Sequence, residues 1–152
     1  MVRTILLAII LLPLPVFSQQ LIGKDKAYVK KFLEQEKARH DSLDITITQN
    51  DSVMVYEIKP GKTKAATFSY RFDKDGRCHS EKVKASCSDC IQQYLQNALA
   101  QKKYGWKKIN ENQYVSAYKH KLMIELSVNE TDFSFYILRA SWTKKLYKIL
   151  ME

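Results

Sequence analysis

The chain has 152 residues, a formal net charge of +9, three cysteines and a hydrophobic fraction of 45%. This length allows one compact domain, or two small units that share a core. Only four glycines are present and there is no GxSxG sequence, which excludes a glycine-rich phosphate loop and a hydrolase nucleophile elbow.

The first residues have the pattern of a secretory signal peptide. Arg3 precedes an apolar run from Ile5 to Leu12, and two prolines follow before Ser18. A signal peptidase needs small or slim residues at the cut, so we expect cleavage after Ser18 and a signal peptide at 1–18. The run is short for a membrane span, which needs about 20 apolar residues, although an uncleaved anchor is the alternative. We therefore expect an exported chain, periplasmic or extracellular, with no integral membrane span after cleavage.

Basic residues outnumber acidic ones along the whole of the remaining chain. Residues 19–85 carry 14 basic and 10 acidic side chains, and residues 86–152 carry 10 and 6. Only four of these basic residues are arginine, whereas nucleic-acid readers favour arginine for base and phosphate contacts. Nucleic acid is therefore disfavoured as a partner, and attraction to anionic lipid or polysaccharide stays open.

The chain contains two similar halves. A shift of 62 residues places YVKKFLEQEKA, from Tyr28, on CIQQYLQNALA, from Cys90, so that Val29 falls on Ile91. In each half a helix comes first, because apolar residues recur at the spacing of a buried helical stripe. Asp25 can cap the first helix. Ser86 and Asp89 resemble a capping box for the second.

Strands are expected after each helix, because alternation of apolar and polar residues replaces the helical period. In the first half they lie around Leu43–Ile47 and Ala66–Phe72, between turns at Asn50-Asp51, Pro60-Gly61 and Asp75-Gly76, with the weakest strand near Cys78–Lys84. In the second half they are expected at 106–109, 114–118, 122–128 and 133–138. Three aromatic side chains of one strand should share its core face: Phe68, Tyr70 and Phe72.

A short helix is expected at the C-terminal end, in SWTKKLYKILME. Trp142, Leu146 and Ile149 could share one face of it, with lysines outside that face. We expect this helix to dock on the protein's own sheet. A helix lying on a membrane surface is the alternative, although it would need a longer apolar face.

The expected fold class is α+β, with two tandem units of one helix and a four-stranded antiparallel sheet. The units span 19–85 and 86–152, form one compact globule, and could join their sheets into one. This order of elements resembles the tandem plan of the bacterial beta-lactamase inhibitory protein and of periplasmic PepSY-type modules. The signal and the size also resemble small exported bacterial proteins. The resemblance implies a binding or inhibitory role and carries no diagnostic motif, so it assigns no residue.

The three cysteines, Cys78, Cys87 and Cys90, lie close together in the sequence. In an oxidising compartment a disulfide is expected, and we expect a bridge from Cys78 to Cys87 or Cys90, with Cys87 preferred. One alternative is a redox-active pair, Cys87 and Cys90, at a helix start. Another is a zinc site that adds His79. It is disfavoured because His79 and Cys78, adjacent on a strand, would point to opposite faces.

Two tyrosines are candidates for an exposed binding surface. Tyr114 and Tyr118 lie opposite Val115 and Ala117 in an alternating strand, and rigid aromatic rings on an open sheet face suit protein binding. The three histidines are isolated and form no HExxH doublet. We expect no catalytic residue, metal or cofactor.

These observations predict an exported, non-enzymatic binding or accessory protein of the bacterial periplasm or envelope. It should contact a protein or another envelope component through its sheet face. The alternative is a thiol-active accessory protein that uses Cys87 and Cys90 for dithiol redox chemistry or metal binding.

Overall fold

The computed structural model describes residues 21–61, 63–127 and 132–152. The expected signal peptide at 1–18 and its cleavage after Ser18 lie outside the described residues. None of the helices in the described ranges is both long and apolar enough to cross a membrane.

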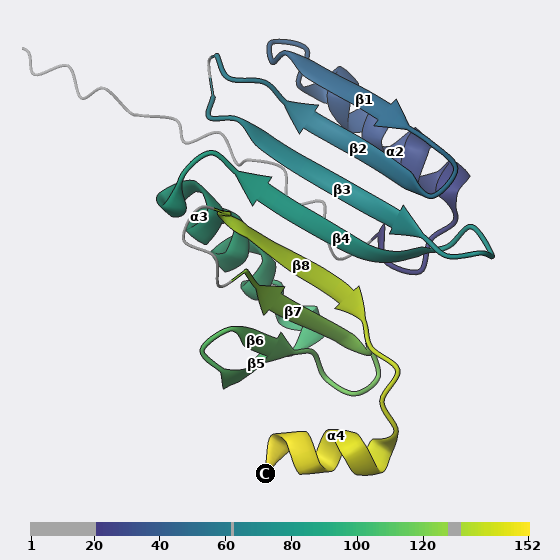
Figure 1. The fold of residues 1–152 in the computed structure, drawn as a ribbon, viewed down its shortest axis with the longest axis vertical. Coiled ribbons are helices and arrows are strands. Elements are labelled where there is room, and N and C mark those ends of the chain that lie inside the picture. Colours follow the sequence, from purple (N-terminus) through teal and green to yellow (C-terminus); the bar gives the residue numbers. More distant parts are fainter. Residues whose placement is uncertain (1–20, 62, 128–131) are drawn as a thin grey trace, which may run out of the picture.

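Eight antiparallel strands form one continuous sheet, and the fold class is α+β as the sequence predicts (Figure 1). The order across the sheet is β1-β2-β3-β4-β8-β7-β6-β5, so the two halves of the chain meet where β4 pairs with β8. That seam runs from Ser80 opposite Leu138 to Lys84 opposite Ser134. The strands are β1 Ile45–Gln49, β2 Val53–Ile58, β3 Ala66–Phe72, β4 Cys78–Ala85, β5 Lys107–Asn110, β6 Gln113–Val115, β7 Leu122–Leu126 and β8 Ser134–Arg139.

Two helices, α2 Lys26–Arg39 and α3 Ser88–Leu99, cover the same face of the sheet (Figure 1). The predicted cap of α2 is confirmed, because the Asp25 carboxylate accepts a hydrogen bond from the Tyr28 N–H at 2.8 Å. The predicted capping box of α3 is displaced by one residue. Cys87 is the N-cap there, since the Ser86 N–H bonds to the Ala65 carbonyl and so continues the strand contact.

A single apolar core lies between these helices and the sheet. It joins Val29 and Leu33 of α2, Ile91 of α3, and strand residues from both sides of the seam. The inward orientation predicted for three aromatics of β3 is confirmed, because Phe68, Tyr70 and Phe72 are all buried. One core therefore holds both halves of the chain.

The strand with the weakest sequence pattern, β4, is one of the two central strands of the sheet. Its inward-facing positions include Glu81, which is fully buried, so the expected apolar alternation is interrupted. Glu81 pairs with Tyr70 on β3 and with Ile137 on β8. Burial raises the pKa of Glu81 to about 8, and the nearby Tyr70 hydroxyl lowers it in part.

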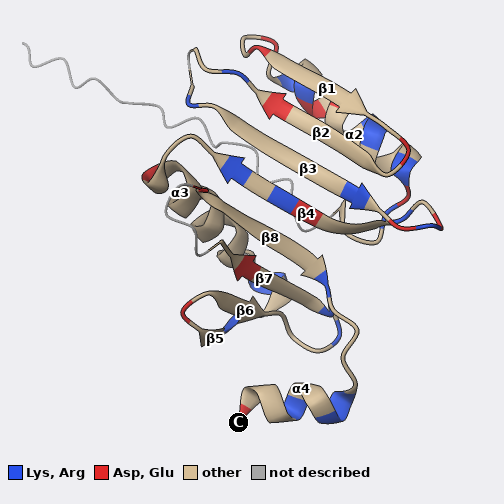
Figure 2. Ribbon diagram, in the orientation of Figure 1, with Lys and Arg blue, Asp and Glu red and all other residues tan. Residues whose placement is uncertain are grey.

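The C-terminal helix, α4 Lys144–Met151, has no buried residue. The three residues predicted to share one face of this helix do not have the same surroundings. Trp142 precedes the helix and is buried, whereas Leu146 and Ile149 are exposed. Lys and Arg side chains are spread over α2, β4 and α4, with fewer acidic side chains between them (Figure 2). The described surface therefore shows no dedicated basic arm.

Candidate functional site

A cationic pocket lies at one end of the central strands. Neighbouring strands run in opposite directions, so the start of β4, the start of β7 and the end of β8 meet at the same end of the sheet. Arg77 precedes β4, Leu122 begins β7 and Arg139 ends β8, and all three line the pocket. Its volume is about 590 Å³.

One wall of the cationic pocket is the segment from Leu21 into α2. The Gly23 N–H donates to the Cys78 carbonyl at 2.7 Å, and the Cys78 N–H donates to the Lys24 carbonyl at 2.8 Å. Gly23 has φ of 85°, a left-handed conformation that favours glycine. These bonds fix the segment beside β4, where the Lys24 Nζ lies 5.2 Å from the centroid of the Tyr28 ring.

The opposite wall is a 3-10 turn, η1 Lys102–Tyr104. Tyr104 is buried, and its carbonyl accepts a hydrogen bond from the Ala117 N–H at 2.7 Å. The Tyr104 ring packs edge-on against His120, with 5.1 Å between ring centroids. Lys103 Nζ lies 4.7 Å from the centroid of the Tyr104 ring. A lysine–tyrosine pair therefore stands on each side of the pocket.

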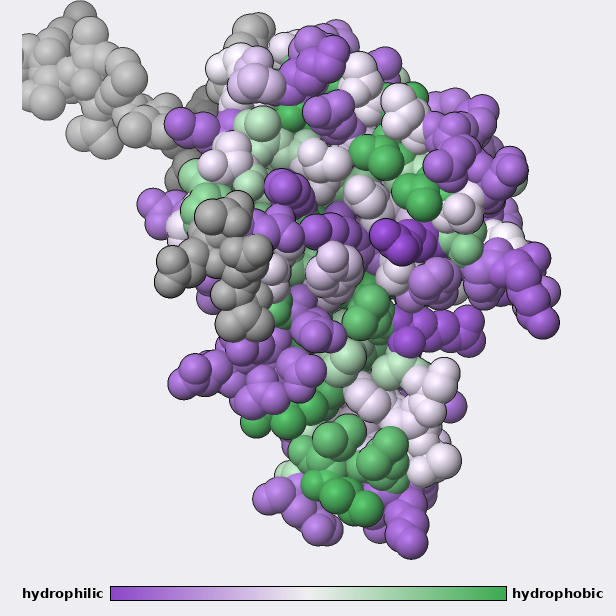
Figure 3. Space-filling model, in the orientation of Figure 1, coloured by the Kyte–Doolittle hydropathy of each residue, from purple (hydrophilic) through white to green (hydrophobic). Residues whose placement is uncertain are grey.

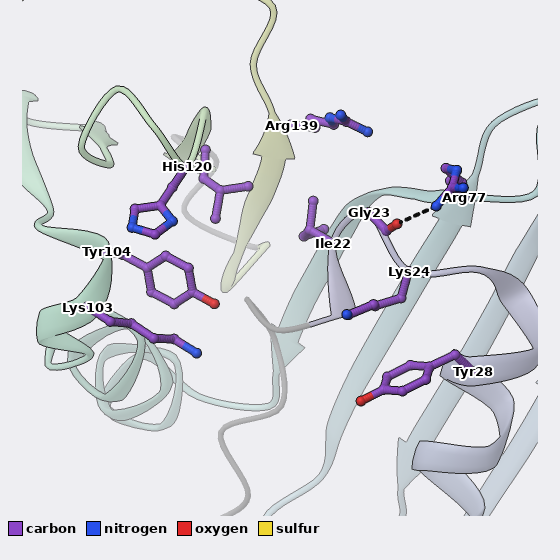
Figure 4. Close-up of a pocket in the computed structure, with 10 residues that line it drawn as sticks. Ile22, Gly23, Lys24, Tyr28, Arg77, Lys103, Tyr104, His120 and Arg139 are labelled. Carbon is purple, nitrogen blue, oxygen red and sulfur yellow. Dashed lines mark hydrogen bonds between the residues drawn. The ribbon is translucent and has the colours of Figure 1, made fainter.

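Figure 4 shows how these two pairs face each other. Lys24 approaches from the segment before α2 and Tyr28 from α2 itself, whereas Lys103 and Tyr104 approach from η1. The polar ends of these side chains are directed into the space between. Ammonium groups and phenol hydroxyls are hydrogen-bond donors that oxyanions accept. The centre of the pocket is therefore suited to an oxyanion.

Two arginines add to the positive character of the pocket. Arg77 Nη1 donates to the Gly23 carbonyl at 3.3 Å, and a guanidinium has five N–H donors in all. The described lining residues include four Lys or Arg and one His, with no Asp or Glu. An excess of positive charge in a concave site attracts anions and raises their local concentration.

The cysteines pair differently from the expected arrangement. Cys87 and Cys90 form a disulfide with each other, and Cys78 is free and buried. The predicted bridge from Cys78 is therefore wrong. Cys78 begins the eight-residue strand β4, and at about 3.3 Å per residue the far end of that strand lies beyond the ~7 Å Cα separation that a disulfide allows. Burial raises the pKa of the Cys78 thiol to about 12, so it is held as a thiol.

The zinc set considered from the sequence is not assembled. Two of its four members, Cys87 and Cys90, are bonded to each other. Of the other two, Cys78 is buried, whereas His79 is exposed. In the described part of the chain, no group of three or more His, Cys, Asp or Glu residues is arranged to hold a metal ion.

Tyr114 and Tyr118, the candidates for an exposed binding surface, are both half-buried. Tyr114 is partly buried and packs against the core cluster. Tyr118 follows β6 and is also half-buried, with its ring centroid 5.5 Å from that of Tyr147 in α4.

The pocket residues were not candidates in the sequence, because they are spread from Ile22 to Arg139. Each lysine there has the same local pattern as a solvated surface lysine. One signal was available: two of the four arginines after residue 18, Arg77 and Arg139, line this pocket, and arginine is the side chain that binds phosphate and carboxylate in a fork.

Comparison of the chain with protein-family models, curated proteins and solved structures found no significant match. The fold and the site by themselves define a single-sheet α+β protein with a cationic pocket at the end of its central strands.

Proposed function

We propose that the protein is an exported, non-enzymatic binding protein that holds an oxyanion-bearing component of the bacterial envelope in the cationic pocket. One observation carries this proposal: four Lys or Arg side chains and no described carboxylate surround a cavity of about 590 Å³. A cavity of that size lies within the usual range for small-ligand sites, which is about 300–1,000 Å³. The ligand is therefore a phosphate, sulfate or carboxylate carried on a larger unit, such as a sugar.

The pocket supports this role better than the sheet face does. Tyr28, which is 48% exposed, adds ring surface beside Lys24, so a saccharide unit can pack there while its anionic group meets the ammonium groups. On the sheet face, by contrast, Tyr114 packs against the core and Tyr118 against α4. A protein partner on the sheet face stays a prediction from the sequence.

Binding of sodium tripolyphosphate, measured by isothermal titration calorimetry, tests the proposal. The double variant Lys24→Gln, Lys103→Gln removes one ammonium group from each wall, and we expect its affinity to fall about tenfold or more. The matched control is Lys31→Gln, Lys37→Gln on the exposed surface of α2, which lowers the net charge equally. Equal losses in both variants would show that net charge, and not the pocket, attracts the anion.

The same proposal includes a duplicated architecture. α2 begins at Lys26 and α3 at Ser88, while β1 begins at Ile45 and β5 at Lys107; both intervals equal the 62-residue shift of the repeat. Equivalent helix residues Val29 and Ile91 are both buried. These coincidences support two copies of one helix-and-strands module, with the pocket where the two copies meet.

A thiol-active role is the second candidate, and the Cys87–Cys90 disulfide favours it. Both cysteines are half-buried at the start of α3, and the Cys87 sulfur accepts a hydrogen bond from the Cys90 N–H at 3.2 Å. In this role a partner dithiol would be oxidised to a disulfide by thiol–disulfide exchange, and Cys87 and Cys90 would be reduced to two thiols.

Alkylation followed by mass spectrometry tests the cysteine arrangement. In urea without reductant we expect one label, on Cys78, because the other two cysteines are bonded. A label on Cys87 or Cys90 would contradict this pairing. Equilibration with glutathione then tests the role: a reduction potential between about −270 and −120 mV fits an exchanging pair, whereas one below about −300 mV fits a structural bridge.

A further inference from the structure

The C-terminal helix α4 carries an apolar face that the described protein does not cover. Three large hydrophobic side chains are exposed in the described ranges, and two of them, Leu146 at 48% and Ile149 at 59%, are on α4. They are three positions apart, so they share one face of the helix. In Figure 3 hydrophobic surface gathers over α4, with hydrophilic surface beside it.

The attachment of α4 to the body holds this face outward. The Tyr147 hydroxyl donates to the Ser116 carbonyl at 3.1 Å, and its ring centroid lies 5.5 Å from that of Tyr118 and 6.1 Å from that of Trp142. Thr143 caps the helix by accepting a hydrogen bond from the Leu146 N–H at 3.2 Å. Leu146 is therefore presented on a fixed helix.

One basic side chain, Lys145, borders the exposed face, whereas Lys144 and Lys148 lie toward the other side of α4 at about 100° per residue. Lys144, Lys145 and Lys148 lie on α4 itself and are exposed. Lys121 adds a fourth charge from the loop before β7, with its Nζ 5.5 Å from the centroid of the Tyr118 ring that contacts α4. Among the acidic residues, Asp73 lines a pocket together with Lys121, and Glu152 follows the helix. The surface thus combines apolar, aromatic and cationic groups in one place.

We propose that α4 docks on the surface of a bilayer that contains anionic lipid. Leu146 and Ile149 enter the boundary between headgroups and acyl chains, while Lys145 and Lys121 contact lipid phosphates. Each lysine near an anionic surface raises the affinity roughly fivefold.

Charge complementarity favours a bilayer over a second copy of the chain. Two copies joined through Leu146 and Ile149 would bring Lys145 of both α4 helices together, and like charges at an interface oppose association. An anionic lipid surface has the opposite sign and accepts the same lysines. The surface is separate from the cationic pocket, since none of its residues line that pocket.

Flotation with two kinds of vesicle tests this proposal. We expect the full chain to float with vesicles of equal parts phosphatidylglycerol and phosphatidylcholine, and not with phosphatidylcholine alone. Leu146→Gln, Ile149→Gln should reduce the bound fraction about tenfold or more, since glutamine keeps helix propensity but removes the apolar contact. Lys121→Gln, Lys145→Gln should reduce it similarly, whereas the charge-matched Lys31→Gln, Lys37→Gln should not.

Other outcomes would overturn the inference. Binding that is lost in Lys24→Gln, Lys103→Gln but kept in Leu146→Gln, Ile149→Gln would assign the lipid contact to the cationic pocket instead. Concentration-dependent dimers that the α4 variant abolishes, without vesicle binding by the parent chain, would assign α4 to self-association. Equal circular dichroism spectra and melting temperatures among the variants exclude unfolding as the cause.

Discussion

Replacing Glu81 by Gln is expected to make the free energy of unfolding nearly independent of pH between about 5 and 8. In the folded protein Glu81 is fully buried in the central strand β4, and burial raises its pKa to about 8. In the unfolded chain the same carboxyl returns to the ordinary pKa of 4.5. Between these two values the unfolded state has released the proton and the folded state still holds it.

The sign of the effect follows from proton linkage. Because the folded state binds more protons in that window, the parent protein loses stability as pH rises from about 4.5, and the loss is complete above about 8. Each pH unit corresponds to about 1.4 kcal/mol, which sets an upper limit of about 5 kcal/mol over the window. Glu81→Gln keeps the shape of the protonated acid and cannot ionise, so its advantage over the parent should grow with pH.

Urea denaturation at a series of pH values measures this difference. The control is Glu57→Gln, because Glu57 is exposed on β2 and its replacement should leave the pH slope unchanged. Two other carboxyls have lowered pKa values. A backbone hydrogen bond from Arg77 lowers the pKa of Asp73, and a side-chain hydrogen bond from Lys82 lowers that of Asp132, so both titrate below the pH window of Glu81. Identical slopes for the parent and Glu81→Gln between pH 5 and 8 would contradict the assignment.

The same residue shows why one central strand was hard to predict. Sequence periodicity identifies strands whose inward positions are all apolar, as in β3 with Phe68, Tyr70 and Phe72. In β4 one of the inward positions is occupied by the polar residue Glu81. This position is buried because β3 and β8 lie on either side of it, which the sequence of β4 alone does not show. The cap at Asp25 was predicted correctly from local sequence, whereas the cap of α3 is Cys87 and not the predicted Ser86.

Long-range geometry accounts for the other differences. The pairing of Cys87 with Cys90 follows from the length of β4, which carries Cys78 away from both, although the three cysteines are close in sequence. The cationic pocket depends on the antiparallel order that brings Lys24 and Lys103 to one end of the sheet. Neither the cysteine pairing nor the pocket can be predicted from the periodicity of the sequence, because both depend on which strands become neighbours.

The continuous sheet also leads to a prediction about folding: Leu33→Ala in α2 should shift the unfolding transition of the other half of the chain. Leu33 is fully buried, and its truncation should cost about 2–5 kcal/mol and lower the melting temperature by roughly 10 °C. The only tryptophans, Trp106 and Trp142, are both in the second half. β4 pairs directly with β8, and one core cluster joins α2 to α3, so the tryptophan transition should move as far as the circular dichroism transition.

Gln35→Ala is the matched control, because Gln35 is exposed on the same helix and its truncation should leave both transitions within about 0.5 kcal/mol of the parent. If Leu33→Ala leaves the tryptophan transition unmoved while circular dichroism shows an earlier one, the two halves unfold separately. Coincident shifts mean that the β4–β8 seam transmits stability across the whole sheet. In that case one cooperative unit holds both walls of the cationic pocket, so Lys24 and Lys103 stay at a fixed separation. A pocket that selects its ligand by size requires such a fixed separation.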